Sequence, residues 1–135
     1  MERERLKEIR WKQRFENYLS ALEHLQNGVE RQELDDLQRA GVIQFFEMSF
    51  ELAWKVMKDY LESEGILVRS PREAIKEAYR IGLIDRGELW LSALQERNLA
   101  AHTYDERILE EFTEEIRHEF FPLMITLKDN LERSL

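Results

Sequence analysis

The sequence predicts an all-α fold: an up-and-down antiparallel bundle of four to five helices that forms a single domain over residues 1–135. Three observations predict it. Apolar residues recur at steps of three and four through most of the chain, only five glycines and two prolines interrupt it, and no segment alternates as a strand would. With 43% apolar residues, a chain of 135 residues can build its own core.

The first predicted helix carries an amphipathic stripe over the N-terminal quarter of the chain. Leu6 and Ile9 fall out of phase with this stripe, so we expect the first ten residues to project beyond the bundle. Asn27-Gly28 is expected to end the helix. The charged segment 29–41 then forms a connector or a fraying start to the next helix. The stripe consists of Trp11, Phe15, Tyr18, Leu22 and Leu25.

A second helix is predicted from about Val42 to Glu64, and it is apolar over most of its circumference. Such a helix must be covered on several sides, so we expect a second chain to supply part of the cover. We expect its narrow polar stripe to be solvated; the alternative is that Glu47 or Lys55 faces the loop at residues 96–106 or a partner chain. The stripe comprises Gln44, Glu47, Glu51, Lys55, Lys58 and Glu62. The apolar face includes Phe45, Phe46, Phe50, Leu52, Trp54, Val56, Met57, Tyr60 and Leu61.

Capping signals place two shorter helices after it. Ser70 is an N-cap, with Pro71 at the first helical position and Glu73 completing a capping box. Gly82 is expected to end this helix. Another helix follows and reaches Arg97 or slightly beyond.

The last helix is predicted to begin near Tyr104, because Thr103 and Glu106 form a second capping box. It continues to the C-terminus with apolar residues at helical spacing. Pro122 falls inside it and is expected to kink or split the helix.

Composition narrows the function classes. The net charge of −8 disfavours indiscriminate nucleic-acid binding, so RNA or nucleotide chemistry would need a focused site, and DNA is not an expected partner. No apolar run is long enough to span a bilayer, and the charged start has no apolar signal region. The absence of cysteine fits a reducing compartment. We therefore expect a cytoplasmic protein without a membrane partner.

The segment "ERNLAAHTYDE", Glu96 to Glu106, concentrates chemistry between two predicted helices. Arg97 and His102 would lie about 140° apart on a continuous helix. The cap at Thr103 predicts a bend that brings both side chains to one groove beside the final helix. Arginine offers a planar fork to phosphate oxygens, and imidazole exchanges protons near neutral pH.

The site prediction has a structural alternative. Arginine near a helix C-terminus complements the helix dipole, and Asn98 is a common helix-ending residue. His102 could simply secure the turn. The three histidines, at positions 24, 102 and 118, do not fall at metal-ligand spacing with carboxylates, so we expect neither a metal nor a cofactor. His24 and His118 receive no role.

Two stretches resemble a known family, the HEPN proteins of the nucleotidyltransferase substrate-binding type. They are "FEMSFELAWKVMKDYL" and the segment from Ser70 to Glu106, and the resemblance covers roughly residues 10–130. Arg97, His102 and Tyr104 match the R-x4-H-x-Y motif of that family. Asn98 is the polar residue that often follows the arginine.

The resemblance implies a five-helix bundle that forms a homodimer with the motifs at a shared cleft. Many relatives, called HepT, are toxins of toxin–antitoxin pairs and act as metal-independent ribonucleases. Carried over, Arg97 would bind the scissile phosphate, His102 would act as general acid or base, and Asn98 would orient the site. Tyr104 would accept AMP from ATP, transferred by a minimal nucleotidyltransferase (MNT) partner.

The same resemblance also supports a second interpretation. The chain would then be a non-catalytic substrate-binding or nucleotide-binding subunit of a two-component nucleotidyltransferase. The acidic net charge fits this alternative better, because ribonucleases usually attract RNA.

Overall fold

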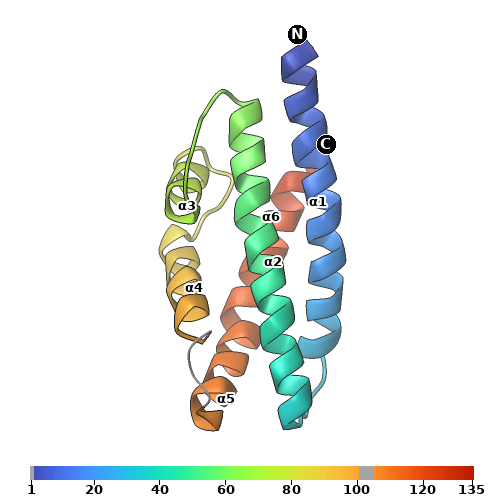
Figure 1. Ribbon diagram of the computed structural model, residues 1–135, viewed down its shortest axis with the longest axis vertical. Helices are drawn as coiled ribbons and strands as arrows, with labels where there is room; N and C mark the ends of the chain where they lie inside the picture. Colours follow the sequence, from blue (N-terminus) through green and yellow to red (C-terminus); the bar gives the residue numbers. More distant parts are fainter. Residues whose placement is uncertain (1, 101–104) are drawn as a thin grey trace.

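The computed structural model of the protein describes residues 2–100 and 105–135, and every regular element in them is helical (Figure 1). Three long helical stretches and two shorter helices were predicted, and this is confirmed, because the last three elements form one nearly continuous helix. In chain order the elements are α1 (Glu2–Val29), α2 (Asp36–Ser63), α3 (Pro71–Arg80), α4 (Gly87–Ala100), α5 (Glu106–Glu115), the π-helical η1 (Ile116–Phe120) and α6 (Phe121–Glu132).

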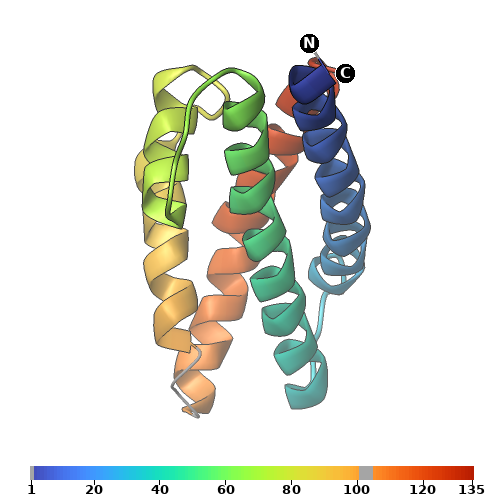
Figure 2. The ribbon, with the colours of Figure 1, turned by 45° about the horizontal axis from the view of Figure 1, so that its top comes forward.

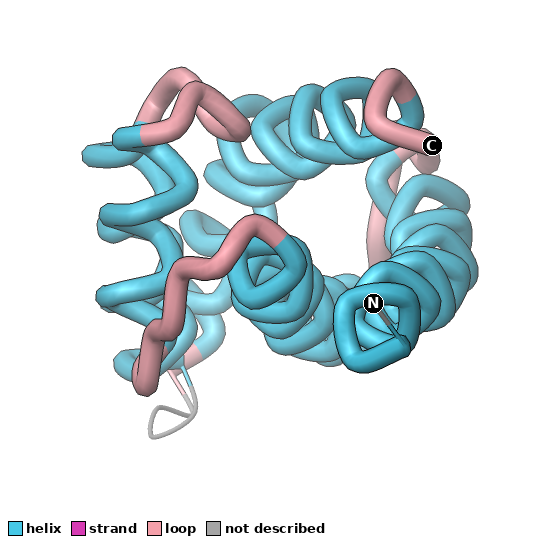
Figure 3. Tube along the Cα trace, turned by 90° about the horizontal axis from the view of Figure 1, so that it is seen from above, coloured by secondary structure: helices cyan, strands magenta, loops and turns pink. Residues whose placement is uncertain are grey.

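The long elements alternate in direction, as predicted for an up-and-down bundle. In Figures 1 and 2, α1 descends, α2 rises beside it, α4 descends, and α5 through α6 rises again. The short helix α3 lies next to α2 and above α4. Seen from above in Figure 3, α2 lies between α1 and the α3–α4 pair.

This central position explains the composition of α2. Many of its apolar side chains are buried, including Phe46, Phe50 and Met57 at 0% exposure, and the helix contacts α1, α3, α5 and α6. Neighbouring helices of the same chain therefore cover most of α2, and the second chain that we expected to supply part of the cover stays a prediction. On this helix Met48 stays 46% exposed, with half-buried Leu52 one turn away.

The first two helices are held at close range. A Cβ atom on Gly28 would lie 2.7 Å from Cγ2 of Val42, so glycine permits the close approach of α1 to α2. The helix continues through Gly28 to Val29, one residue past the predicted end, because the Val29 side chain is buried. Arg117 donates to the carbonyls of Val29 (3.1 Å) and Arg31 (2.9 Å), which caps the C-terminus of α1.

The start of α2 was predicted too late. The helix begins at Asp36 because Asp35 and Gln38 form a reciprocal capping box, with bonds of 2.7 and 3.0 Å. Segment 30–35 is thus the connector.

At α3, Ser70 caps as predicted by accepting from the N–H of Glu73 (3.1 Å). Glu73 itself accepts from the N–H of Arg69 at 2.9 Å, one residue before the N-cap, so the box closes on a different donor. Gly82 follows the helix with φ of +83°, a conformation that favours glycine.

The final helix was predicted to be kinked or split at Pro122, and it stays continuous but turns π-helical just before that residue. Proline lacks an N–H, and its ring crowds the carbonyl four residues earlier, so the regular α-helical hydrogen bonding cannot continue through it. The chain accommodates this with the five π-helical residues of η1, after which α6 resumes at Phe121. On the bundle's inner side Tyr18 donates to the Met124 carbonyl at 2.7 Å, and burial raises the pKa of its phenol well above the ordinary value.

The N-terminal turns behave as expected. Leu6 and Ile9 are 60% and 42% exposed, and in Figure 1 the first turns of α1 extend beyond the other helices. In the described part of the chain, none of the helices combines the length and the apolarity that crossing a membrane requires.

Candidate functional site

Of the predicted site residues, the structure describes Arg97 and Asn98, which lie at the C-terminal end of α4. Arg97 lies in the last turn of that helix, and Asn98 follows it with an exposed side chain. His102, Thr103 and Tyr104 lie outside the described residues. The helices α4 and α5 run in opposite directions (Figure 1). The predicted bend after Ala101 falls outside the described residues.

The predicted start of the last helix needs a correction. The N-cap of α5 is Asp105, whose Oδ1 accepts from the N–H of Arg107 at 2.9 Å, and the helix begins at Glu106. Thr103 was the predicted cap. Aspartate is at least as good an N-cap as threonine, and it stands two residues later in the same segment.

Arg97 reaches across from α4 to α2. Its Nη1 donates to Oε2 of Glu51 at 2.8 Å, and its Cζ lies 5.3 Å from the centre of the Phe50 ring. That ring is buried and packs on Trp90, with ring centres 5.9 Å apart. The guanidinium is therefore held by a carboxylate at one edge and an aromatic face below.

Glu51 receives further bonds from its own helix. Trp54 Nε1 donates to Oε2 at 3.1 Å, and Lys55 Nζ lies 3.2 Å from Oε1. Partial burial acts to raise the pKa of Glu51, but the hydrogen bonds from Trp54, Arg97 and Lys55 outweigh it and lower that pKa below its ordinary value. The carboxylate is thus ionised at neutral pH.

The polar stripe of α2 is therefore more than a solvated face. We expected solvation, with Glu47 or Lys55 as the alternative contacts to the motif loop. The stripe does turn toward α4, but Glu51 is the residue that binds Arg97. The i,i+4 pair of Glu51 with Lys55 is present as well.

An open groove of about 530 Å³ lies beside this contact. We predicted a groove next to the final helix, but the described lining comes from α2 and α4, because Arg97 points toward α2. Its walls combine apolar and charged groups, and both described motif residues line it. The lining residues are Glu47, Met48, Glu51, Leu52, Arg97 and Asn98.

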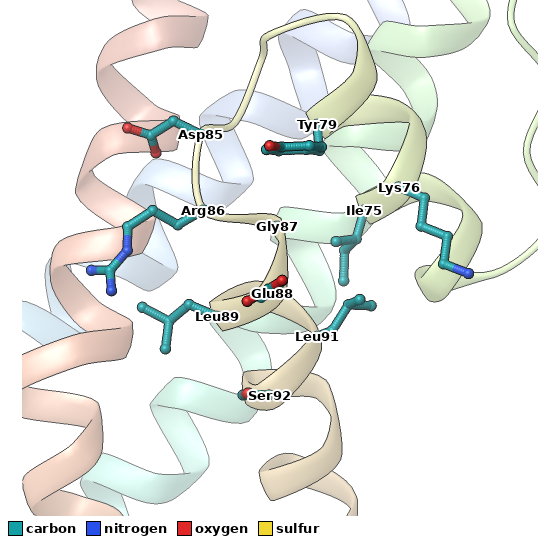
Figure 4. Close-up of a pocket in the computed structure, with 10 residues that line it drawn as sticks. All are labelled: Ile75, Lys76, Tyr79, Asp85, Arg86, Gly87, Glu88, Leu89, Leu91 and Ser92. Carbon is teal, nitrogen blue, oxygen red and sulfur yellow. The ribbon is translucent and has the colours of Figure 1, made fainter.

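A larger hollow of about 700 Å³ lies at the other end of α4, against α3 (Figure 4). Arg97 and Asn98, the two predicted site residues that the structure describes, do not line it. Figure 4 shows the side chains of Lys76 and Arg86 pointing in opposite directions, so these cations do not converge on one ligand charge. Tyr79 forms one wall and packs on Gly87, where an added Cβ would lie 3.2 Å from the ring.

The face of α5 and η1 is acidic. Burial, together with repulsion from Glu96, Glu119 and Glu111, raises the pKa of Glu115. His118 is exposed and lies 3.1 Å from Glu114. In residues 2–100 and 105–135, no three His, Asp or Glu side chains are placed to hold a metal ion together.

The sequence indicated the arginine and the asparagine but not the partner of the arginine, Glu51. Glu51 precedes Arg97 by 46 residues, and local spacing pairs it only with Lys55. Its membership of the polar stripe, on a helix otherwise apolar, was the signal that this face had a neighbour.

Comparison with known proteins identifies the family of this chain. Residues 13–133 match the family described as "Nucleotidyltransferase substrate binding protein like". A probable ribonuclease HepT of Haemophilus influenzae (strain ATCC 51907 / DSM 11121 / KW20 / Rd) is 35% identical over 78 residues, which are 54% of this chain and 53% of that protein. The match thus spans about half the length of this relative.

A solved structure supports the fold. The crystal structure of ttk003001694, a protein from Thermus thermophilus, superposes with a TM-score of 0.78 and 29% sequence identity. The superposition covers 86% of this chain and 97% of that chain. The bundle is therefore shared over nearly its whole extent.

Proposed function

We propose that this chain, a HepT-like HEPN protein that belongs to the nucleotidyltransferase substrate binding protein like family, is a metal-independent ribonuclease that cleaves single-stranded RNA. The observation that carries the proposal is the guanidinium of Arg97 at the wall of an open groove, next to Asn98. The likeness to a probable ribonuclease supports the reaction type.

In this proposal the ribose 2′-oxygen attacks the adjacent phosphorus, and the bond from phosphorus to the 5′-oxygen breaks. A 2′,3′-cyclic phosphate and a 5′-hydroxyl result. A general base on the protein takes the proton of the 2′-hydroxyl, and a general acid protonates the leaving 5′-oxygen. His102 serves as general acid or base, since imidazole titrates near neutral pH.

Arg97 stabilises the negative charge that the phosphate oxygens gain in the transition state. A guanidinium suits this role because its planar fork can bind two oxygens at once. Asn98, at the same end of α4, orients the substrate with its amide. Together these residues would supply charge stabilisation and proton transfer without a metal or another cofactor.

The proposal includes a silencing partner. A minimal nucleotidyltransferase, encoded as the antitoxin of a toxin–antitoxin pair, would transfer AMP to Tyr104. The phenol oxygen attacks the α-phosphorus of ATP, and pyrophosphate leaves. The modification would place bulk and negative charge beside Arg97, where a substrate phosphate must bind. We further propose a homodimer; exposed Met48 and Leu99, at 46% and 59%, lie on the helices that line the groove.

The test is cleavage of single-stranded RNA by the purified protein with EDTA present. We expect cleavage by the wild type and a rate reduced about 100-fold or more in Arg97→Ala and in His102→Ala, because each variant lacks a group that acts in the transition state. Product ends are identified by mass spectrometry, where a cyclic phosphate is expected.

Lys76→Ala is the matched control, because it removes a cation from α3 that lines the other hollow. It should cleave at the wild-type rate. A wild type that leaves a varied set of RNAs intact, or an Arg97→Ala variant that still cleaves, would contradict the ribonuclease proposal.

A second candidate is a binding subunit that presents a nucleotide or another acceptor to the nucleotidyltransferase without cutting RNA. The charge favours it: the chain carries −8 overall, and Glu47 and Glu51 both line the groove. In this case calorimetry should detect nucleotide or partner binding that depends on Arg97, while the cleavage assay stays negative.

A further inference from the structure

We propose that Glu51 is a positioning residue, which holds the guanidinium of Arg97 in the orientation that receives the phosphate. This inference rests on the proposed function and adds to it a residue from α2, outside the R-x4-H-x-Y segment. Glu51 does not touch substrate in this account; it acts through Arg97.

The carboxylate of Glu51 is held by residues of its own helix, in addition to its contact with Arg97 on α4. Trp54 and Lys55 follow it by three and four residues on the same helical face, and they contact Oε2 at 3.1 Å and Oε1 at 3.2 Å, respectively. Both oxygens are therefore engaged from one side. The rotamer is fixed by its own helix, which is what a supporting residue requires.

Arg97 is then restrained at two points. Nη1 donates to Glu51 at 2.8 Å, and the guanidinium lies over the buried Phe50 ring, 5.3 Å from its centre. A guanidinium has five N–H donors, and this ion pair uses only one nitrogen of the fork. The other two nitrogens, Nε and Nη2, carry donors that can bind phosphate oxygens, and the restraint on Nη1 orients them in advance.

The charge of the cluster is compatible with an anionic substrate. One carboxylate lies between two cations, Lys55 and Arg97, so the three side chains carry a net charge of +1. Glu51 therefore anchors Arg97 without making the cluster negative. Arg97 is also the less exposed partner, with 22% of its side chain accessible against 41% for Glu51.

An ordinary surface ion pair is the competing explanation. Such pairs contribute little and can be removed without consequence. The two explanations differ in kinetics: a positioning role predicts a loss in kcat, whereas a surface pair predicts none. Both explanations predict the same decrease in KM, since removing a negative charge beside the groove should strengthen RNA binding, so kcat is the quantity that separates them.

The experiment compares Glu51→Gln, Glu51→Ala and Glu47→Gln in steady-state RNA cleavage. We expect kcat to fall roughly 10- to 100-fold in Glu51→Ala, because misplacing a reacting group by about 1 Å costs that much. Glu51→Gln keeps an acceptor of the same shape, so its kcat should fall less, while its KM decreases. A variant that is only partly folded would show a lower apparent kcat with an unchanged KM, so a fall in both values is not explained by loss of folding.

Glu47→Gln is the matched control. Glu47 lies one turn earlier and lines the same groove, and its carboxylate makes no hydrogen bond or ion pair with the described part of the chain. Its removal also takes away one negative charge, so KM should decrease while kcat stays within about twofold. An equal fall in kcat for Glu47→Gln and Glu51→Gln would overturn the positioning role, and so would an unchanged kcat in Glu51→Ala.

A second measurement does not depend on activity. In the wild type the bond to Glu51 should hinder rotation of the Arg97 guanidinium, giving separate Nη signals in nitrogen-15 spectra, assigned by their loss in Arg97→Lys. These signals should average in Glu51→Ala and stay separate in Glu47→Gln. If the wild type already shows averaged signals, Glu51 does not fix Arg97, whether or not RNA is cleaved. If the wild type shows separate signals but does not cleave RNA, Glu51 still positions Arg97 and the ribonuclease proposal is wrong.

Discussion

At the scale of single residues, Arg97 is explained by two contacts rather than by its helix position. An arginine in a last turn complements the helix dipole, which alone would leave its side chain in solvent. Here the side chain instead pairs with Glu51 and lies over Phe50. The residue therefore has a defined orientation toward a groove, as a phosphate-binding group needs.

Tyr104 carries the prediction about regulation. Incubating the protein with a minimal nucleotidyltransferase and ATP should increase its intact mass by one or more AMP groups, and Tyr104→Phe should abolish this, because only the phenol oxygen can attack ATP at that position. RNA cleavage should fall in parallel with modification.

Tyr79→Phe is the control for this experiment, since Tyr79 is 56% exposed and lies at the other hollow. It should accept AMP as the wild type does. Modification that persists in Tyr104→Phe and disappears in Tyr79→Phe would contradict the assignment.

The sequence predicted Arg97 and Asn98 at the end of a helix because both lie within one local pattern. It did not predict Glu51 as their neighbour, since that contact depends on how α4 packs on α2. Long-range pairs of this kind leave no spacing signal in a single sequence. The capping aspartates at 35 and 105 are local features of the sequence. Asp35 was treated as part of a charged connector, and Thr103 was preferred to Asp105 as the cap of the last helix.

At the scale of elements, α5 concentrates negative charge. Burial raises the pKa of Glu115 most. Repulsion from Glu96 on α4, and from Glu119 and Glu111 on the same helical stretch, raises it further. A carboxyl group whose folded-state pKa is raised stabilises the fold while protonated. That contribution is lost as pH rises through the folded-state pKa.

Glu115→Gln should therefore stabilise the protein at pH 7 and make little difference at a pH below the ordinary range for glutamate. We expect an increase in Tm of about 1 °C at low ionic strength, a small value because the group is partly solvated and screened. Thermal unfolding followed by circular dichroism measures it. Adding salt should reduce the difference, and a lower Tm for the variant at pH 7 would contradict the sign.

The final helix shows what element-level prediction can supply. Pro122 predicted a kink or a split, and the chain adopts five π-helical residues just before it. Which of these outcomes occurs depends on keeping Phe112, Ile116 and Phe120 directed at the core, where they are buried. This depends on tertiary packing, so the sequence alone did not determine how the helix accommodates the proline.

At the scale of the whole molecule, the bundle was predictable because its apolar stripes follow helical spacing in every element. The apolar circumference of α2 does not by itself establish a dimer. A helix apolar on most sides can be covered by neighbours from its own chain, and α2 lies between α1 and the α3–α4 pair (Figure 3) and also contacts α5 and α6. Met48, an exposed apolar residue of α2, lines the groove, so we expect a second copy that covers it to meet the site itself.

The central claim is that RNA phosphate binds Arg97 in the groove between α2 and α4. A crystal structure with a short RNA strand, methylated on its 2′-oxygens so that it cannot be cut, tests this most directly. A phosphate within hydrogen-bond distance of the Arg97 guanidinium, with Glu51 still bound to Nη1, is the predicted result. An ordered strand bound at the hollow beside Tyr79, with no phosphate near Arg97, would contradict it.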